Sequence, residues 1–355
     1  MLLLLLESFT WNIDPEIFTL GPFNLPFPLS IPGLVIGGAI AWFAAQSLLK
    51  KGEPKGKKSK EKKETSSELK FWGIVLAGLI IGQLIALMIG LSTIEQFGPI
   101  SPRWYGFLFA MAFVSGYWIG AKMWTDAGRS VQELENVLFW VLIGTVIGAR
   151  LGHVIFYDLD YYLRNLSQIP AIWNGGLASH GAAVGIIITM IVLSKKKPGM
   201  TFWWLADRVV IPTAIGGAFI RTGNFFNSEI YGHPTDLPWG VIFSRLPGAD
   251  GMIPRHPTML YEALLCIFVF IVIWTVYKKY KAHPPEGSLF GLFLILLFSG
   301  RFFLEYTKIP QAAFASEWSV NMGQWLSVPL VLIGLYIVFA KVKWKKKSNE
   351  QVEAA

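Results

Sequence analysis

Cysteine is almost absent from this 355-residue chain, because Cys266 is its single one and lies inside the apolar run Met259–Val276. One cysteine cannot form an intrachain disulfide, and it cannot supply a cysteine-based metal cluster. We expect the Cys266 thiol to be a buried packing residue.

Apolar residues make up 53% of the chain, which also has 15 tryptophans. Several apolar stretches approach the roughly 20 residues that a helix needs to cross a membrane. This composition excludes an ordinary soluble domain and predicts an all-α, polytopic membrane protein built as a helical bundle. The formal net charge of +8 does not require a nucleic-acid partner, because basic loops of membrane proteins face anionic lipids.

Hydropathy along the chain predicts nine membrane-spanning helices, each close to the required length. The predicted spans are Ile31–Leu49, Phe71–Leu91, Tyr105–Ala121, Val137–Tyr157, Leu177–Ser194, Phe202–Ile220, Thr258–Val276, Ser288–Phe303 and Trp325–Ala340.

Lysine and arginine are unevenly distributed between the predicted loops. Every second loop, together with the C-terminal end, carries basic segments such as Lys50–Lys70 and Lys341–Lys347, and these hold 22 of the 31 basic residues. Because basic loops stay on the cytoplasmic side, the pattern predicts an external N-terminus and a cytoplasmic C-terminus. Arg103, Arg221 and Arg301 fall on the external side, where topology does not explain them.

With this orientation, unusual polar residues gather at the external ends of the spans. Tyr105 opens the third span, His180 lies near the start of the fifth, Arg221 closes the sixth, and Arg301 with Glu305 closes the eighth. Ionisable groups in such places are costly and tend to face the bundle interior or a wet cavity. We therefore expect one functional site at the external membrane boundary.

Structural roles remain open for several of these residues. Arg301 and Glu305 are spaced i,i+4 and can simply pair on one helix face. Arg103 can serve as an interfacial anchor. Arg150 and His153 lie inside a predicted span, where a hydrogen bond to a neighbouring helix is the alternative to a functional role.

Two segments look least like helix packing. Trp173–Gly181 runs from an external loop into a helix, and its glycines allow another backbone or a lipid headgroup to approach closely. Gly216–Glu229 ends a span with polar groups, among which Arg221 and Asn224 are i,i+3 neighbours. A guanidinium beside an amide suits a phosphate or phosphodiester, so this segment predicts an anion-binding site.

Six short motifs follow one another in order over roughly residues 95–345. They are Arg103–Gly106, Gly148–Gly152, Trp173–Gly181, Arg221–Gly232, Pro254–Pro257 with Tyr261 and Glu262, and Gly300-Arg301 with Glu305. In combination, these motifs resemble those of the prolipoprotein diacylglyceryl transferase family of the bacterial inner membrane.

The resemblance implies a seven-span core, so the first two predicted spans form an insertion. The expected divisions are an external N-terminal segment 1–22, an inserted hairpin 23–94 with a Lys-rich cytoplasmic linker 50–70, a transferase core 95–345 and a cytoplasmic tail 346–355. Two local departures stand out. Ser228 replaces a usual glycine, and Lys308 begins a segment that is more typically Arg-x-Pro-Asp.

The resemblance also implies a reaction. The diacylglyceryl group of phosphatidylglycerol would move to the lipobox cysteine thiol of a prolipoprotein signal peptide, releasing glycerol phosphate. The substrate supplies the nucleophile, so the site needs a base and cations for the phosphate. His180 is the candidate base because an imidazole titrates near neutrality, although Tyr105 can compete or the thiolate can form with little help.

Arg221 and Arg301 are expected to hold the phosphate, and they supply enough charge that neither a metal nor a cofactor is expected. Catalytic roles are thus predicted for His180, Arg221, Arg301 and Tyr105. Substrate-binding roles are predicted for Asn224, Asn227, Glu229, Gly232, Glu305 and Arg150, with Glu305 also fixing Arg301. The expected partners are phosphatidylglycerol, the signal peptides and membrane lipids.

Two other classes remain as alternatives. A transporter or lipid-binding protein for anionic substrates would use the external arginines as an entry site, yet it should also show polar features in the cytoplasmic half. A CDP-alcohol phosphotransferase would need an aspartate-rich metal motif on the cytoplasmic side, where Asp207 stands alone.

Overall fold

The computed structural model describes residues 9–29, 34, 36–41, 75–77, 79–82, 84–85, 94–97, 101–280, 283–309, 322–342 and 344. The chain forms two compact units. The smaller unit is Glu16–Pro102, and the larger one combines Met1–Pro15 with Arg103–Ala355.

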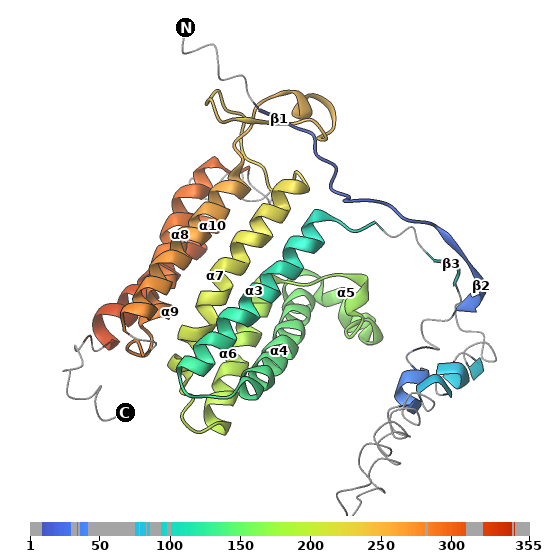
Figure 1. Cartoon of the computed structure of the whole chain (residues 1–355). Helices are drawn as coiled ribbons and strands as arrows, with labels where there is room; N and C mark the ends of the chain where they lie inside the picture. The colour runs from blue at the N-terminus through green and yellow to red at the C-terminus, as the bar shows by residue number, and fades with distance from the viewer. Residues whose placement is uncertain are drawn as a thin grey trace, which may run out of the picture. The chain divides into compact units, whose positions relative to one another are not determined.

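The larger unit is a bundle of long apolar helices (Figure 1). They are α3 (Trp104–Asp126), α4 (Val131–Tyr157), α6 (Ser179–Lys196), α7 (Phe202–Phe226), α8 (Thr258–Lys279), α9 (Ser288–Leu304) and α10 (Met322–Tyr336), with π-helix η7 (Ile337–Lys341) continuing α10. Within the described residues, seven segments are long and apolar enough to cross a membrane. The predicted helical membrane bundle is therefore confirmed, and its last seven spans coincide with these helices.

The first two predicted spans, Ile31–Leu49 and Phe71–Leu91, lie mostly outside the described residues. The smaller unit contains strands β2 (Phe23–Leu29) and β3 (Ile94–Phe97), which pair antiparallel. The division of the chain at residues 22, 94 and 345 stays a prediction.

Local signals explain where two of the helices begin. The Ser130 side chain accepts a hydrogen bond from the Glu133 backbone N–H at 3.3 Å, and Thr201 accepts one from that of Trp204 at 3.0 Å. Each satisfies an amide that the first helical turn leaves without a partner. The i,i+3 spacing of Ser130 and Glu133 is that of a capping box.

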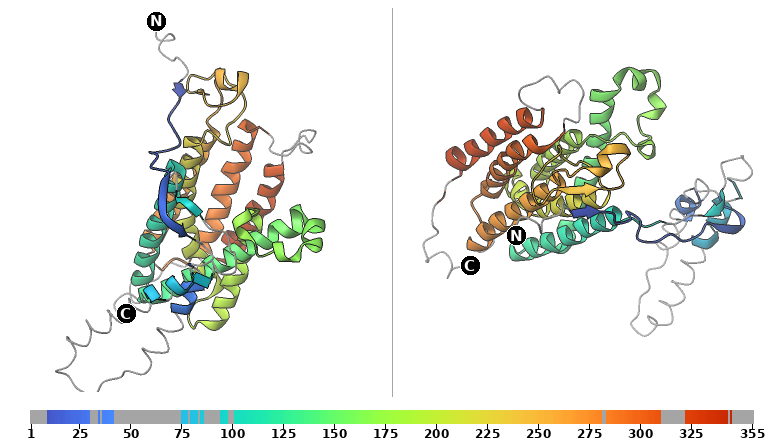
Figure 2. Two further views of the ribbon diagram at one scale, coloured as in Figure 1. Left: turned by 90° about the vertical axis from the view of Figure 1, so that its right-hand side faces the viewer. Right: turned by 90° about the horizontal axis from the view of Figure 1, so that it is seen from above.

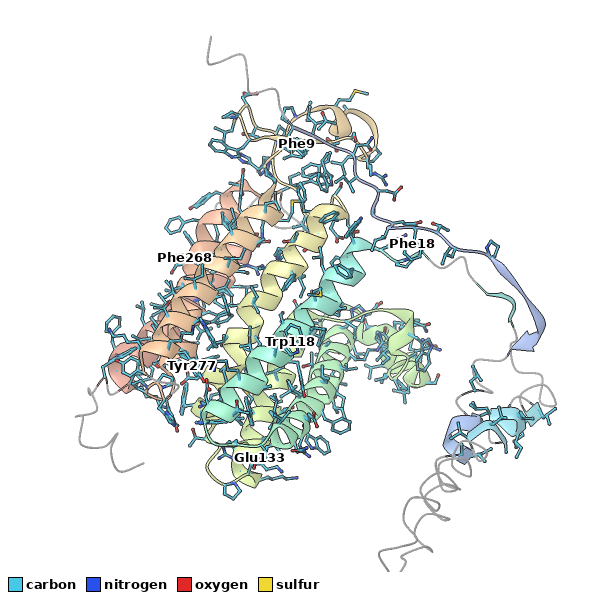
Figure 3. The ribbon with its side chains drawn as sticks, in the orientation of Figure 1. Phe9, Phe18, Trp118, Glu133, Phe268 and Tyr277 are labelled. Atoms are coloured by element: carbon cyan, nitrogen blue, oxygen red, sulfur yellow. The ribbon has the colours of Figure 1, made fainter. Side chains whose placement is uncertain are left out.

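Helix α7 is the centre of the bundle. It packs against α3 on one side and against α8 and α9 on another, as the view from above in Figure 2 shows. Its buried face contributes Val210, Ile211 and Ala214 to a core shared with α8 and α9. In contrast, Trp118 and Phe268 point outward on α3 and α8, where apolar side chains suit a lipid environment (Figure 3).

Helices α4 and α6 approach each other through glycines. A Cβ atom at Gly148 would lie 2.4 Å from the Gly181 carbonyl oxygen, and one at Gly185 would lie 2.1 Å from that of Gly144. Small residues at such positions let two membrane helices pack backbone against backbone. The glycines of the Gly148–Gly152 motif therefore have a packing function.

The two ends of the bundle differ in character. One end, here called the cap end, carries residues 227–257, which pack on strand β1 (Phe9–Trp11). There β1 pairs parallel with β4 (Val241–Phe243), a small addition to the predicted all-α architecture. The opposite end, here called the lysine end, carries the last turns of α6 and α8 with their lysines.

At the lysine end, a buried side chain of α7 holds the start of α9. The Asp207 carboxylate accepts hydrogen bonds from the backbone N–H groups of Gly287 at 2.7 Å and Phe290 at 2.8 Å. A carboxylate at a helix N-terminus is favoured by the helix dipole as well as by these bonds. The contact fixes the position of α9 against α7.

Replacement of Gly148 by alanine is expected to destabilise the bundle. The added methyl group would collide with the backbone of α6, so the free energy of unfolding should fall by about 1–3 kcal/mol. Thermal unfolding in detergent measures the change. Gly116→Ala on α3 is the matched control, since its Cβ would meet Pro212 at an ordinary 3.4 Å. Equal midpoints for the two variants would contradict the proposed helix contact.

Candidate functional site

Arg221 at the end of α7 is held by a carboxylate from α8. Its Nε lies 3.0 Å from Glu262 Oε2, and its Nη1 lies 3.5 Å from Asn224 Oδ1, the long limit of a hydrogen bond. In the described part of the chain, no hydrogen bond or ion pair occupies Nη2. The guanidinium is therefore oriented while part of it stays available to an anion.

The Glu262 carboxylate is shared with a lysine. Lys308 Nζ lies 2.6 Å from Glu262 Oε1 and 3.3 Å from Glu305 Oε2. The side chains of Glu262 and Lys308 are each 7% exposed, so these charges are largely removed from water. Four charged residues thus form a chain of alternating sign, Arg221, Glu262, Lys308 and Glu305, that links α7 and α8 to the 3₁₀ helix η5 (Glu305–Thr307).

A turn after α7 presents a second carboxylate. Asn224 and Asn227 donate from their side-chain amides to Glu229 Oε1, at 2.8 and 3.1 Å. The turn has an unusual backbone, because Ser228 and Ile230 have φ values of +54° and +61°. Residues other than glycine rarely adopt positive φ values, which explains why a glycine would suit position 228. The predicted binding residues Asn224, Asn227 and Glu229 therefore form one hydrogen-bonded group.

Gly232 brings the cap against the end of α9. Its N–H donates to the His256 carbonyl at 2.9 Å, and the neighbouring His233 N–H donates to the Thr307 carbonyl at 3.0 Å. A Cβ at Gly232 would lie 2.3 Å from the Thr307 oxygen, so a side chain cannot fit there. The structure gives this predicted site residue a clear role in close backbone approach.

Tyr105 lies in the first turn of α3, beside the last turns of α7. A Cβ at Gly223 would lie 2.9 Å from the Tyr105 ring, which places the ring directly on the backbone of α7. Trp104 stacks on Phe226 at 5.2 Å and holds the same two helix ends together. This geometry brings Tyr105 close to the segment that carries Arg221 and Asn224.

Arg301 lies in the last turn of α9 and is partly buried. Within the described residues its guanidinium makes no hydrogen bond or ion pair, and no ion pair joins it to Glu305. Helix α9 ends at Leu304 and tightens into η5, and Glu305 forms an ion pair with Lys308. The predicted pairing of Arg301 with Glu305 is thus not among the described contacts. The Arg301 guanidinium is available to a ligand.

Arg150 is buried and organises the loop before α6. It donates to the carbonyl oxygens of Gln168 and Ile169, both at 2.7 Å, and to those of Gly175 at 2.6 Å and Gly176 at 3.1 Å. Carbonyl groups thus occupy most of its five N–H donors. The geometry supports the structural alternative for Arg150, and substrate binding by this residue stays a prediction.

His180 lies in the first turn of α6 and is exposed. Its ring packs against Phe156 and Tyr157 of α4, with centroids 5.2 and 5.9 Å away. In the described residues, no hydrogen bond, ion pair or ring contact joins His180 to Arg221. His180 and Arg221 both lie at the cap end, but His180 is on α6 and Arg221 is on α7.

The sequence analysis did not predict one set of hydrogen-bonded side chains at the cap end. Trp239 Nε1 donates to the Tyr261 hydroxyl at 2.9 Å, and that hydroxyl lies 3.2 Å from His256 Nδ1. Burial, with a smaller contribution from His233, lowers the pKa of His256 below its usual value. The hydrogen bond between the Tyr261 hydroxyl and His256 Nδ1 links α8 to the segment before it. The motif Pro254–Pro257 with Tyr261 and Glu262 contained His256 and Tyr261, but the sequence gave no sign of the Trp239 contact.

The described residues contain no group of three or more His, Cys, Asp or Glu side chains arranged to hold a metal ion.

Comparison with known proteins gives consistent matches to the bundle. Residues 92–340 match the family model described as prolipoprotein diacylglyceryl transferase. A phosphatidylglycerol–prolipoprotein diacylglyceryl transferase of Tolumonas auensis is 44% identical over 252 residues, covering 71% of this chain and 96% of the relative. The protein of the same name from Chloroherpeton thalassium is 40% identical, covering 69% of this chain and 90% of the relative.

Replacement of Arg150 by lysine is expected to loosen the loop 165–178. One ammonium group cannot reach four carbonyl oxygens that face a planar guanidinium, so several would lose their donor. Hydrogen exchange of the loop amides should become faster. Arg164→Lys on α5 (Leu159–Arg164) is the control, because that side chain is exposed. Unchanged protection in Arg150→Lys would exclude the anchoring role.

Proposed function

Since the chain belongs to the prolipoprotein diacylglyceryl transferase family, we propose that it transfers the diacylglyceryl group of phosphatidylglycerol to prolipoproteins. The acceptor is the lipobox cysteine of a signal peptide, and the reaction is the first step of bacterial lipoprotein maturation. The transporter alternative is not favoured, because the family model and the curated relatives carry the name of a transferase.

The orientation of Arg221 is the observation that supports this proposal best. Glu262 holds Nε on one side, which leaves a terminal nitrogen for a phosphate oxygen. Arg301 at the end of α9 offers a second cation at the same end of the bundle. Two positioned guanidinium groups suit a phosphodiester that becomes a more highly charged phosphate monoester in the reaction.

The chemistry requires one bond to form and one to break. The thiolate of the acceptor attacks the glyceryl carbon of the lipid, a sulfur–carbon bond forms, and the carbon–oxygen bond to phosphate breaks. Glycerol phosphate leaves with the electron pair, and Arg221 and Arg301 stabilise its negative charge. The thiol proton passes to a base, for which His180 is the first candidate and Tyr105 the second.

The hydrogen-bonded group of Asn224, Asn227 and Glu229 is proposed to orient the glycerol headgroup. Both amides bind one oxygen of the Glu229 carboxylate, and the side chain is exposed. An oriented, exposed carboxylate is a suitable acceptor for hydroxyl groups. Gly232 and Glu305 shape the same region, and Tyr105 lies beside it.

We further propose that the protein lies in the bacterial inner membrane with its cap end outside. The seven apolar segments of the described residues make it a multi-pass membrane protein. Lys195, Lys196, Lys278 and Lys279 all lie at the opposite end, as cytoplasmic basic residues do. The N-terminus would then be external and the C-terminus cytoplasmic.

Arg221→Ala is expected to reduce transfer by at least about 10²-fold, because an oriented cation at the leaving phosphate is lost. The assay uses purified protein in phosphatidylglycerol vesicles with a synthetic lipobox peptide and follows the diacylglyceryl mass on the peptide cysteine. Arg245→Ala is the matched control, since Arg245 pairs with Asp14 in the cap. Absence of the adduct with the parent protein would refute the transferase.

His180→Gln is expected to lower kcat by at least about 10²-fold, because the acceptor thiol loses the group proposed to take its proton. Steady-state rates with the lipobox peptide measure this effect. Retention of most activity in His180→Gln, with loss of activity in Arg221→Ala, would remove His180 from the base role.

A further inference from the structure

We infer that Lys308 is a positioning residue that keeps Arg221 competent to bind the phosphate of the lipid substrate. The inference rests on the proposed function and extends it to a residue that does not reach the substrate itself. Its basis is the shared carboxylate of Glu262, which contacts Arg221 with one oxygen and Lys308 with the other.

The position of Lys308 argues against direct contact with a substrate. Its side chain is 7% exposed, and its Nζ faces two carboxylates, those of Glu262 at 2.6 Å and Glu305 at 3.3 Å. A buried ammonium group in this setting neutralises charge in the protein. Any effect of Lys308 on the reaction must therefore pass through these carboxylates.

The carboxylate of Glu262 has two opposing effects on Arg221. It orients the guanidinium through Nε, and its negative charge also reduces the attraction of Arg221 for a phosphate. Lys308 offsets the second effect, because it shares the same carboxylate at a shorter distance. With Lys308 present, Glu262 orients Arg221 without cancelling its charge.

The backbone fixes Lys308 in this place. Lys308 pairs antiparallel with Gly232, and the Thr307 carbonyl accepts from the His233 N–H. Gly232 has no space for a side chain at this contact. The cap end therefore sets the position of the Lys308 ammonium group. This position in turn determines the charge around Arg221.

The decisive experiment measures KM for phosphatidylglycerol and kcat separately for Lys308→Gln and Lys308→Arg. Lys308→Gln should raise KM about tenfold and lower kcat as well, because Arg221 acts on the phosphate both in the bound lipid and in the leaving group. Lys308→Arg keeps the positive charge and should restore KM to within about threefold of the parent. Lys122→Met is the control, since it removes a lysine that pairs with Asp126 on the surface.

The double variant Glu262→Gln/Lys308→Gln separates charge from structure. Glutamine at position 262 keeps the size of the side chain but carries no charge, so the KM of the double variant should fall below that of Lys308→Gln. A parental KM in Lys308→Gln would overturn the inference. So would an equally raised KM in all three variants.

If Lys308→Gln does not fold, the double variant decides instead. A KM within about threefold of Lys308→Arg supports the inference, and one about tenfold higher overturns it. Thermal midpoints in detergent identify the folded variants. An inactive parent protein would refute the proposed transferase, whereas an active parent with an unaffected Lys308→Gln variant would refute the role of Lys308 alone.

Discussion

A carboxylate in an apolar helix bundle is stable when cations lie beside it, because burial removes the water that would otherwise solvate its charge. Glu262 meets this condition by contacting Arg221 and Lys308 at once. The two cations come from the ends of different helices, so the carboxylate also determines where those ends lie. The backbone contact between Gly232 and Lys308 holds one of these cations in place.

Helix α7 combines two functions. Its middle supplies Ile211 and Ala214 to the core, while its last turns supply Arg221 and Asn224 to the candidate site. The packing of Tyr105 on Gly223 joins α3 to the same turns. The candidate site therefore rests on the most buried helix of the bundle, which is suited to hold side chains in fixed orientations.

The sequence predicts the helices well and their lateral contacts poorly. Hydropathy found the seven spans because lipid requires long apolar runs, and i,i+3 spacing related Arg221 to Asn224. The i,i+4 spacing of Arg301 and Glu305 pointed to a pair that the described contacts do not include, because α9 ends at Leu304. The bond from Lys308 to Glu262 joins residues on different elements, and local spacing contains no signal for it.

The hydrogen bonds from Gly287 and Phe290 to Asp207 have an effect beyond the start of α9. Asp207 and Arg221 belong to α7, and Phe290 and Arg301 belong to α9. Joining the two helices at the lysine end thereby contributes to the separation of the two guanidinium groups at the cap end. The spacing of the two arginines that we propose to bind the phosphate is thus determined partly at the opposite end of the bundle.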